Sequence, residues 1–153
     1  VDAQMGSEKA MSAVAAGLAG ANMIYESSGM TASLLGVSFE AFVLDNEMLS
    51  HVNRMIRGVE VNEETLGFEA IKAVVTGEGH FLGSDHTMAA MQRDYFYPTL
   101  ADRNDPASWA ELGAPDAWSM AKTKAIEILQ SHNPEYLSQD ADRAIRERFN
   151  ILM

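Results

Sequence analysis

A run of small residues from Gly6 to Gly20 limits the possible folds of this chain more than any other feature. Alanine has the highest helix propensity, and small side chains let a helix backbone lie close to a neighbouring element. We therefore predict a helix that packs tightly on its neighbour, as helices that cover a sheet do. The alanines that give the run this character are Ala10, Ala13, Ala15, Ala16 and Ala19.

A short apolar segment with a polar end follows this helix. Met23-Ile24-Tyr25 is compatible with a buried strand, and Glu26 to Gly29 has the composition of a turn. A helix, a tight turn, a buried strand and a polar loop form the repeating unit of parallel α/β proteins, so we predict a short strand near 22–26. The alternative is that residues 21–29 only connect two helices.

After Gly36 the apolar residues recur with helical spacing, and the ends of the helices are marked. Ser38 is a good N-cap, and Arg54, Arg57 and Gly58 are typical of a helix end. Similar signals predict helices near 38–57, 62–77, 84–97, 105–113, 115–131 and 138–149. The fold class is predicted to be mainly α, with one short strand and about six helices. The apolar end, 151–153, is expected to dock on the body.

The charge of the chain excludes two classes of partner. With 22 acidic and 11 basic residues, the net charge is −11. Nucleic acid and anionic membrane surfaces would both be repelled, so we expect neither as a partner. A cationic ligand or a basic protein surface is compatible with this charge, but acidic composition also serves solubility alone.

The sequence contains no cysteine, which excludes disulfides, thiolate nucleophiles and zinc–sulfur sites within it. A reducing compartment fits best, so we expect a cytoplasmic protein. No apolar run approaches the roughly 20 residues that a membrane span needs. The first residues, Val1-Asp2-Ala3-Gln4, are typical neither of a signal peptide nor of a start at methionine, so we expect a chain trimmed from a longer one.

Carboxylates and aromatic rings gather near the polar loop and the helix after it. Asp45 falls on a helix face beside apolar residues, where a carboxylate needs a cation or a strong donor. A salt bridge with Arg54 or Arg57, or simple exposure, is the alternative. Carboxylates together with aromatic faces suit an ammonium ion, although aromatic residues at helical spacing usually belong to the core. The residues concerned are Tyr25, Glu26, Phe39, Glu40, Phe42, Asp45 and Glu47.

The loop Gly77–Gly83 combines three glycines with an apolar centre that is unusual for a solvent loop. His80 in this loop and His86 beyond it are the closest approach to a local metal pair. Their spacing differs from the i, i+4 arrangement of helical zinc sites, so we favour His80 and Phe81 as residues that line a pocket. Walker, G-x-G-x-x-G, G-x-S-x-G and paired C-x-x-C motifs are all missing from the sequence.

Several short sequence motifs occur in a characteristic order over nearly the whole length of the chain. They resemble the trimethylamine methyltransferase (MttB-like) family. The motifs are Asp2-Ala3-Gln4, Gly17-Leu18-Ala19-Gly20-Ala21-Asn22 with Ile24-Tyr25 and Gly29, Val43-Leu44-Asp45-Asn46-Glu47, Arg54 to Gly58, Val61-Asn62-Glu63-Glu64-Thr65, Gly79-His80-Phe81-Leu82-Gly83 with His86-Thr87, and Ala114-Pro115-Asp116.

This resemblance implies a (β/α)8 TIM-barrel enzyme of several hundred residues, of which the chain would be the C-terminal part. Residues 1–36 would then be the last helix/strand unit of the barrel, and 37–153 a C-terminal helical region, in one folding unit truncated at its N-terminus. Active sites of such barrels lie at the carboxyl ends of the strands. Those positions would be Asp2-Ala3-Gln4 and Tyr25-Glu26-Ser27-Ser28.

The resemblance also implies an activity, in which a methyl group passes from a methylated amine to the cobalt of a corrinoid on a separate protein. The sequence has no corrinoid-binding D-x-H-x-x-G motif, so we expect the corrinoid on that partner and none in this chain. The amine is trimethylamine or a betaine; the pyrrolysine position of the family would lie before Val1. We expect a homo-oligomer and no bound metal, and assign no catalytic residue. Expected substrate-binding residues are Gln4, Tyr25, Glu26, Ser27, Asp45, His80 and Phe81.

Two other functions stay open at this point. The ten methionines suit a non-catalytic helical interaction or oligomerisation module, because methionine adapts to varied partner surfaces. A metal-assisted hydrolase using His80 and His86 is a third hypothesis. The isolated chain is expected to be inactive as an enzyme, because most strands of the implied barrel are missing.

Overall fold

Helix α2, Phe39–Arg57, is the element on which the best packed part of the protein is built. A computed structural model describes residues 2–132 and 134–151, and over these the chain forms eight helices and two strands. The prediction of a mainly helical chain is confirmed. The other elements are α1 (Ala3–Leu18), β1 (Met30–Thr31), β2 (Gly36–Val37), α3 (Glu63–Leu66), α4 (Phe68–Thr76), α5 (Asp85–Asp94), α6 (Pro106–Glu111), α7 (Ala117–Ser131) and α8 (Gln139–Arg148).

Four helices begin at the polar N-cap residues that the sequence predicted. Ser38 accepts a hydrogen bond from the backbone N–H of Ala41, and the side chains of Asn62, Ser84 and Ser138 cap α3, α5 and α8 in the same way. The helix predicted near 62–77 is two helices, α3 and α4, because Gly67 between them adopts a left-handed conformation with φ of 63°.

The strand that we predicted near 22–26 is wrong. These residues form turns and extended backbone without a strand partner among the described residues. The only described strands are β1 and β2, which pair antiparallel with Met30 opposite Val37. A strand is defined by the hydrogen bonds to its neighbours, and apolar β-compatible residues alone do not supply them.

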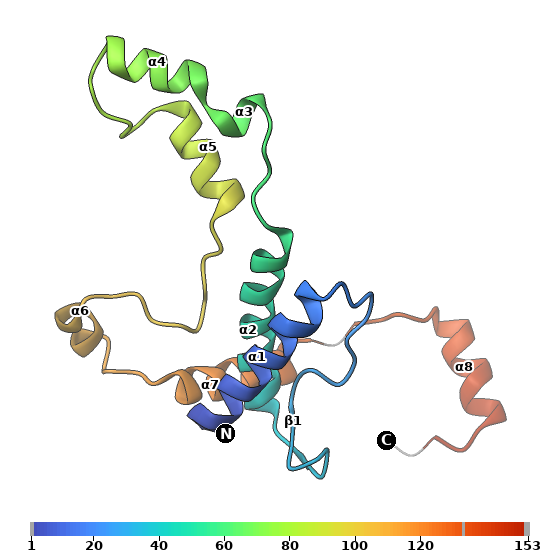
Figure 1. The fold of residues 1–153 in the computed structure, drawn as a ribbon. Helices are drawn as coiled ribbons and strands as arrows, with labels where there is room; N and C mark the ends of the chain where they lie inside the picture. Colours follow the sequence, from blue (N-terminus) through green and yellow to red (C-terminus); the bar gives the residue numbers. More distant parts are fainter. Residues whose placement is uncertain (1, 133, 152–153) are drawn as a thin grey trace.

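The core lies along α2, which packs on α1 on one side and on α7 on another (Figure 1). The small residues of α1 are explained by this packing: a Cβ added at Gly17 would lie 2.1 Å from Cδ1 of Ile56 on α2. The described neighbour of α1 is therefore a helix instead of a sheet. Ala13, Ala41, Val52, Ala121 and Ala125 are buried in these two contacts.

Helices α3, α4 and α5 form an arm beyond the C-terminal end of α2 (Figure 1). Two arginines at that end of α2 hold the arm: Arg54 Nε donates to the carbonyl of Asp94 at 2.5 Å, and Arg57 to the carbonyl of Arg93 at 2.7 Å. Because both acceptors lie at the end of α5, the two arginines bond the carbonyls that a helix end leaves free.

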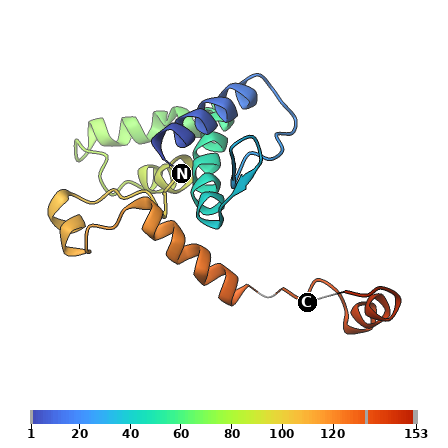
Figure 2. The same cartoon turned by 90° about the horizontal axis from the view of Figure 1, so that it is seen from below.

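Much of the protein is open to solvent. Its accessible surface is 12079 Å², whereas a compact protein of 16.7 kDa is expected to expose about 7,600 Å². Helix α8 stands apart from α1, α2 and α7 in two perpendicular views (Figures 1 and 2). Of the apolar end that we expected to dock, Ile151 is 44% exposed, and Leu152 and Met153 lie outside the described residues.

Candidate functional site

The segment after α1 turns back on that helix and forms a cleft with it. Glu26 adopts a left-handed conformation with φ of 56°, which is uncommon for a residue with a side chain. This turn places Tyr25, Glu26 and Ser27 opposite Glu8 and Lys9 of α1, around a cleft of about 380 Å³. The tyrosine ring is 75% exposed. The cleft therefore presents two carboxylates and an aromatic ring to solvent, a combination that attracts cations.

Asp45 is linked to this cleft through Lys9, which lines it. Its carboxylate is 3% exposed and lies 2.5 Å from Lys9 Nζ of α1. The backbone N–H of Gly29 donates to the same oxygen, Oδ2, at 2.8 Å. Asp45 therefore joins α1, α2 and the end of the loop. The alternative pairing of Asp45 with Arg54 or Arg57, and that of simple exposure, are both wrong, because Lys9 is the partner.

Gly29 is required at its position by two features of the backbone. Its φ is 75°, in the left-handed region that favours glycine. A Cβ at this residue would lie 2.4 Å from ring atoms of Phe42 on α2. The loop can therefore reach Asp45 only if residue 29 has no side chain.

Gln4 lies in a neighbouring cleft of about 430 Å³ between the first turns of α1 and the β1–β2 hairpin. Its amide Nε2 donates to Oε1 of Glu8 at 2.8 Å. Glu8 and Lys9 line both clefts. The structure thus brings Gln4 into the same region as Tyr25, Glu26, Ser27 and, through Lys9, Asp45.

His80 and Phe81 lie elsewhere, in the connection between α4 and α5 at the far end of the arm (Figure 1). His80 is 3.7 Å from a carboxylate oxygen of Glu78, and it lines a small cleft of about 230 Å³. The structure does not bring these two residues to the cleft at α1. His86, the second member of the alternative metal pair, contacts the carbonyl of Glu64 at 2.8 Å through Nε2.

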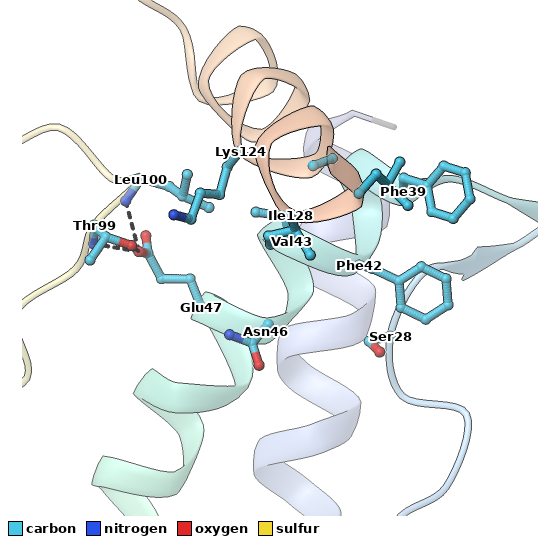
Figure 3. A pocket seen from close by; sticks show the side chains of 12 residues that line it. Ser28, Phe39, Phe42, Val43, Asn46, Glu47, Thr99, Leu100, Lys124 and Ile128 are labelled. Carbon is cyan, nitrogen blue, oxygen red and sulfur yellow. Dashed lines mark hydrogen bonds between the residues drawn. The ribbon is translucent and has the colours of Figure 1, made fainter. Parts of the chain in front are cut away.

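A third cleft, of about 440 Å³, lies between α2, α7 and the segment 99–101 (Figure 3). Phe39 and Phe42 project beside it, and Ser28 lies at its edge. The two phenylalanines are 61% and 41% exposed, so the interpretation of both as core residues is wrong for the described chain.

Glu47 fixes one wall of this third cleft. Its carboxylate accepts hydrogen bonds from the backbone N–H groups of Thr99, Leu100 and Ala101 at 2.5–2.8 Å, and from the Thr99 hydroxyl at 3.0 Å. Burial raises the pKa of Glu47, but the bonds from Leu100, Thr99 and Ala101 outweigh it and hold the pKa below its usual value. The carboxylate is therefore ionised at neutral pH and anchors the segment.

Lys9 is a site residue that the sequence analysis did not name, and the contact of Glu47 with the segment 99–101 was not predicted. The lysine interrupts an otherwise small-residue helix, and this isolated cation was the available signal that a buried carboxylate lies opposite. Nothing local indicates the contact of Glu47, because its partners are 52 to 54 residues further along the chain.

Comparison with known proteins places these features in a family. The family model described as trimethylamine methyltransferase (MTTB) matches residues 1–150. A trimethylamine methyltransferase of Desulfitobacterium hafniense is 36% identical over 147 residues, which are 95% of this chain and 29% of that protein. A glycine betaine methyltransferase of the same species is 30% identical over 146 residues, covering 95% of this chain and 30% of that protein.

An archaeal relative gives the same result. The trimethylamine methyltransferase of Methanosarcina thermophila is 35% identical over 140 residues, which are 91% of this chain and 28% of that protein. The chain thus spans less than a third of the length of these curated relatives. The match extends through α1, the loop at 24–29 and α2, where the candidate site lies. The chain belongs to the trimethylamine methyltransferase (MTTB) family.

Proposed function

We propose that this chain is part of an enzyme that transfers a methyl group from a methylated amine, trimethylamine or a betaine, to a corrinoid carried by a partner protein. Membership of the family is the observation that carries the proposal, since relatives named for trimethylamine and for glycine betaine each match 95% of the chain. The cleft at α1 supports it, because its surface chemistry suits a quaternary or tertiary ammonium group.

Tyr25 and Glu26 are proposed to face the ammonium group. The exposed ring of Tyr25 offers a π-face, and the carboxylate of Glu26 offers a negative charge on the same short loop. Asp45 acts indirectly in this proposal. By accepting from Lys9 and from Gly29, it fixes the loop relative to α1 and leaves Glu8 and Glu26 to carry the charge of the cleft.

The reaction requires positioning more than acid–base chemistry. The C–N bond of the substrate breaks, its electron pair stays on nitrogen, and the methyl carbon is taken up by the reduced corrinoid. The chain has to bind the ammonium group, orient one methyl outward and keep water away from it. Glu8, Tyr25 and Glu26 are the residues that we propose for the first task.

The sequence has no D-x-H-x-x-G motif of the kind that binds a corrinoid. We therefore propose that the corrinoid arrives on its own protein. No helix of the described chain is long and apolar enough to cross a membrane. The (β/α)8 barrel around this chain and a cytoplasmic location are further parts of the proposal.

The test uses the full-length gene product that contains residues 1–153, because the chain spans only part of the family length. The protein is incubated with a reduced corrinoid protein and with trimethylamine or glycine betaine, and methylation of the cobalt is followed by absorbance. Methylation with one of these amines is expected. If neither these nor other methylated amines react, the proposal is wrong.

A further inference from the structure

Lys9 is the one cation among the described residues that line the two clefts at α1. The same linings hold three exposed carboxylates, those of Asp2, Glu8 and Glu26. An unpaired lysine at this place would bind an anionic group of a ligand, because a charged hydrogen bond to a carboxylate is among the stronger polar contacts. The ligands that these clefts attract therefore depend on whether the charge of Lys9 is available.

The charge of Lys9 is taken up by Asp45. Nζ of Lys9 lies 2.5 Å from Oδ2 of Asp45, and the two side chains are only 18% and 4% exposed. A pair of this kind is not easily opened, because either charge alone would be left unpaired in a partly buried place. Lys9 thus lines both clefts, but its ammonium group is bonded to a buried carboxylate of α2.

The pairing of Lys9 has a consequence for the ligands of the cleft that Tyr25 and Glu26 form with α1. Trimethylammonium carries one positive charge, whereas glycine betaine carries a similar ammonium head group together with a carboxylate. That carboxylate would meet the like charges of Glu8 and Glu26, and the lysine that could bind it is already paired. Like charges repel, so the carboxylate of a betaine would weaken its binding.

We propose that Asp45 determines specificity: by pairing with Lys9, it makes the cleft at α1 discriminate against methylated amines that carry a carboxylate. This inference rests on the proposed function, because it concerns the same ammonium-binding cleft and names the class of amine that the cleft takes. Asp45 does not touch the ligand. It acts through Lys9, whose ammonium group is free to turn to the cleft once its partner is lost.

Asp45→Asn separates the charge of this residue from its structural role. The amide oxygen of asparagine can still accept a hydrogen bond from the N–H of Gly29, which Asp45 bonds at 2.8 Å, so the loop keeps its anchor. The negative charge is lost, and Lys9 is left beside the cleft as an uncompensated cation. A second substitution, Lys9→Met, then removes that cation and keeps a long, flexible side chain.

Choline and glycine betaine are the probes, because they share a trimethylammonium group and differ in the carboxylate. Calorimetry on the full-length gene product that contains residues 1–153 gives the two dissociation constants. The wild type is expected to bind choline more tightly. Asp45→Asn is expected to shift the ratio of the two constants towards betaine by about fivefold or more, and the added Lys9→Met to return the ratio to near the wild-type value.

Two further variants separate the effect of charge from a loss of structure. Glu47→Gln also removes a buried carboxylate of α2, but its partners lie at 99–101, so the ratio is expected to stay unchanged. Ser12→Lys adds an unpaired cation to the exposed lining of the cleft without altering Asp45, so it is expected to shift the ratio towards betaine. This exposed substitution tests the proposal even if Asp45→Asn does not fold.

Methyl transfer to the corrinoid protein is measured separately, with trimethylamine and with glycine betaine. The expected shift in the binding ratio without any methyl transfer would support the role of Asp45 and contradict the proposed function. Methyl transfer with an unchanged ratio in Asp45→Asn and in Ser12→Lys would overturn the role of Asp45 and leave the proposed function standing. A ratio that Lys9→Met does not restore, or a wild type that binds betaine more tightly, would also overturn it.

Discussion

Two buried carboxylates on α2 determine how the candidate site is held. Asp45 and Glu47 are separated by one residue and serve different segments: Asp45 binds Lys9 and the N–H of Gly29, and Glu47 binds three successive N–H groups at 99–101. Removal of an acceptor of this kind leaves donors without partners in a buried place, which costs more than the hydrogen bonds themselves contribute.

Replacement of Asp45 is expected to loosen the loop that carries Tyr25 and Glu26. Asp45→Ala leaves Lys9 without its partner and the N–H of Gly29 unbonded, so the free energy of unfolding should fall by about 3 kcal/mol. Urea unfolding measures it. Asp140→Ala is the control, because that exposed pair with Arg143 should contribute less than about 0.5 kcal/mol. Similar losses for both variants would argue against the structural role of Asp45.

Glu47 predicts a specific dependence of stability on pH. Its pKa is lower in the folded protein than the usual 4.5, so the unfolded chain binds a proton more readily. The contribution of Glu47 is therefore complete above about pH 4.5 and is lost as the pH falls through the folded pKa. Unfolding measured from pH 7 to pH 3 should show a steeper loss in the wild type than in Glu47→Gln. Parallel curves would contradict this account.

At the scale of elements, α1 and α2 depend on the absence of side chains at one crossing point. Gly17 faces Ile56, whereas an added Cβ at Gly6 would meet nothing within 4 Å. Both glycines lie in the same helix, so alanine improves helix propensity by the same amount at each. The difference in stability between the two alanine variants therefore measures the effect of the close approach of α1 to α2.

Gly6→Ala should raise the free energy of unfolding by about 0.5–1 kcal/mol, since alanine is the better helix former. Gly17→Ala should give a smaller gain or a loss, because Ile56 has to move aside. Thermal unfolding of the two variants measures the difference. An equal gain at both positions would mean that the helices do not pack as closely as described.

The helices were predictable from sequence because their signals are local. Ser38, Asn62, Ser84 and Ser138 each bond a backbone group three residues away, which a reader of the sequence can anticipate. The prediction of a strand near 22–26 failed because strand pairing depends on a partner elsewhere in the chain, which the residues of the segment themselves do not reveal.

The candidate site was predictable only in part for the same reason. Tyr25, Glu26 and Ser27 are adjacent in sequence, so their proximity was assured, and Gln4 reaches the same region through the regular geometry of α1. The pairing of Lys9 with Asp45 spans 36 residues. Arg54 and Arg57 are closer to Asp45 in sequence, so they were the expected partners. His80 was placed in the site by the apolar character of its loop, and the structure puts that loop on the arm.

At the scale of the whole molecule, the large accessible surface and the open cleft at α1 both fit a chain that is covered by further protein. The chain is rich in apolar side chains that water reaches, and its relatives are more than three times as long as the matched region. We expect an open cleft with Glu8, Tyr25 and Glu26 to bind a small cation only weakly by itself, because water competes for every charge. Coverage by further protein would strengthen the same contacts.

The most direct measurement of the central claim, that the loop at 25–27 contacts the ammonium group, is the KM of the full-length gene product for its methylated amine. Glu26→Gln is expected to raise KM about tenfold or more by removing a charge beside the cation. Glu60→Gln, which removes an exposed charge from the connection between α2 and α3, is the control and should leave KM unchanged. An unchanged KM in Glu26→Gln, with the protein folded and active, would contradict the account.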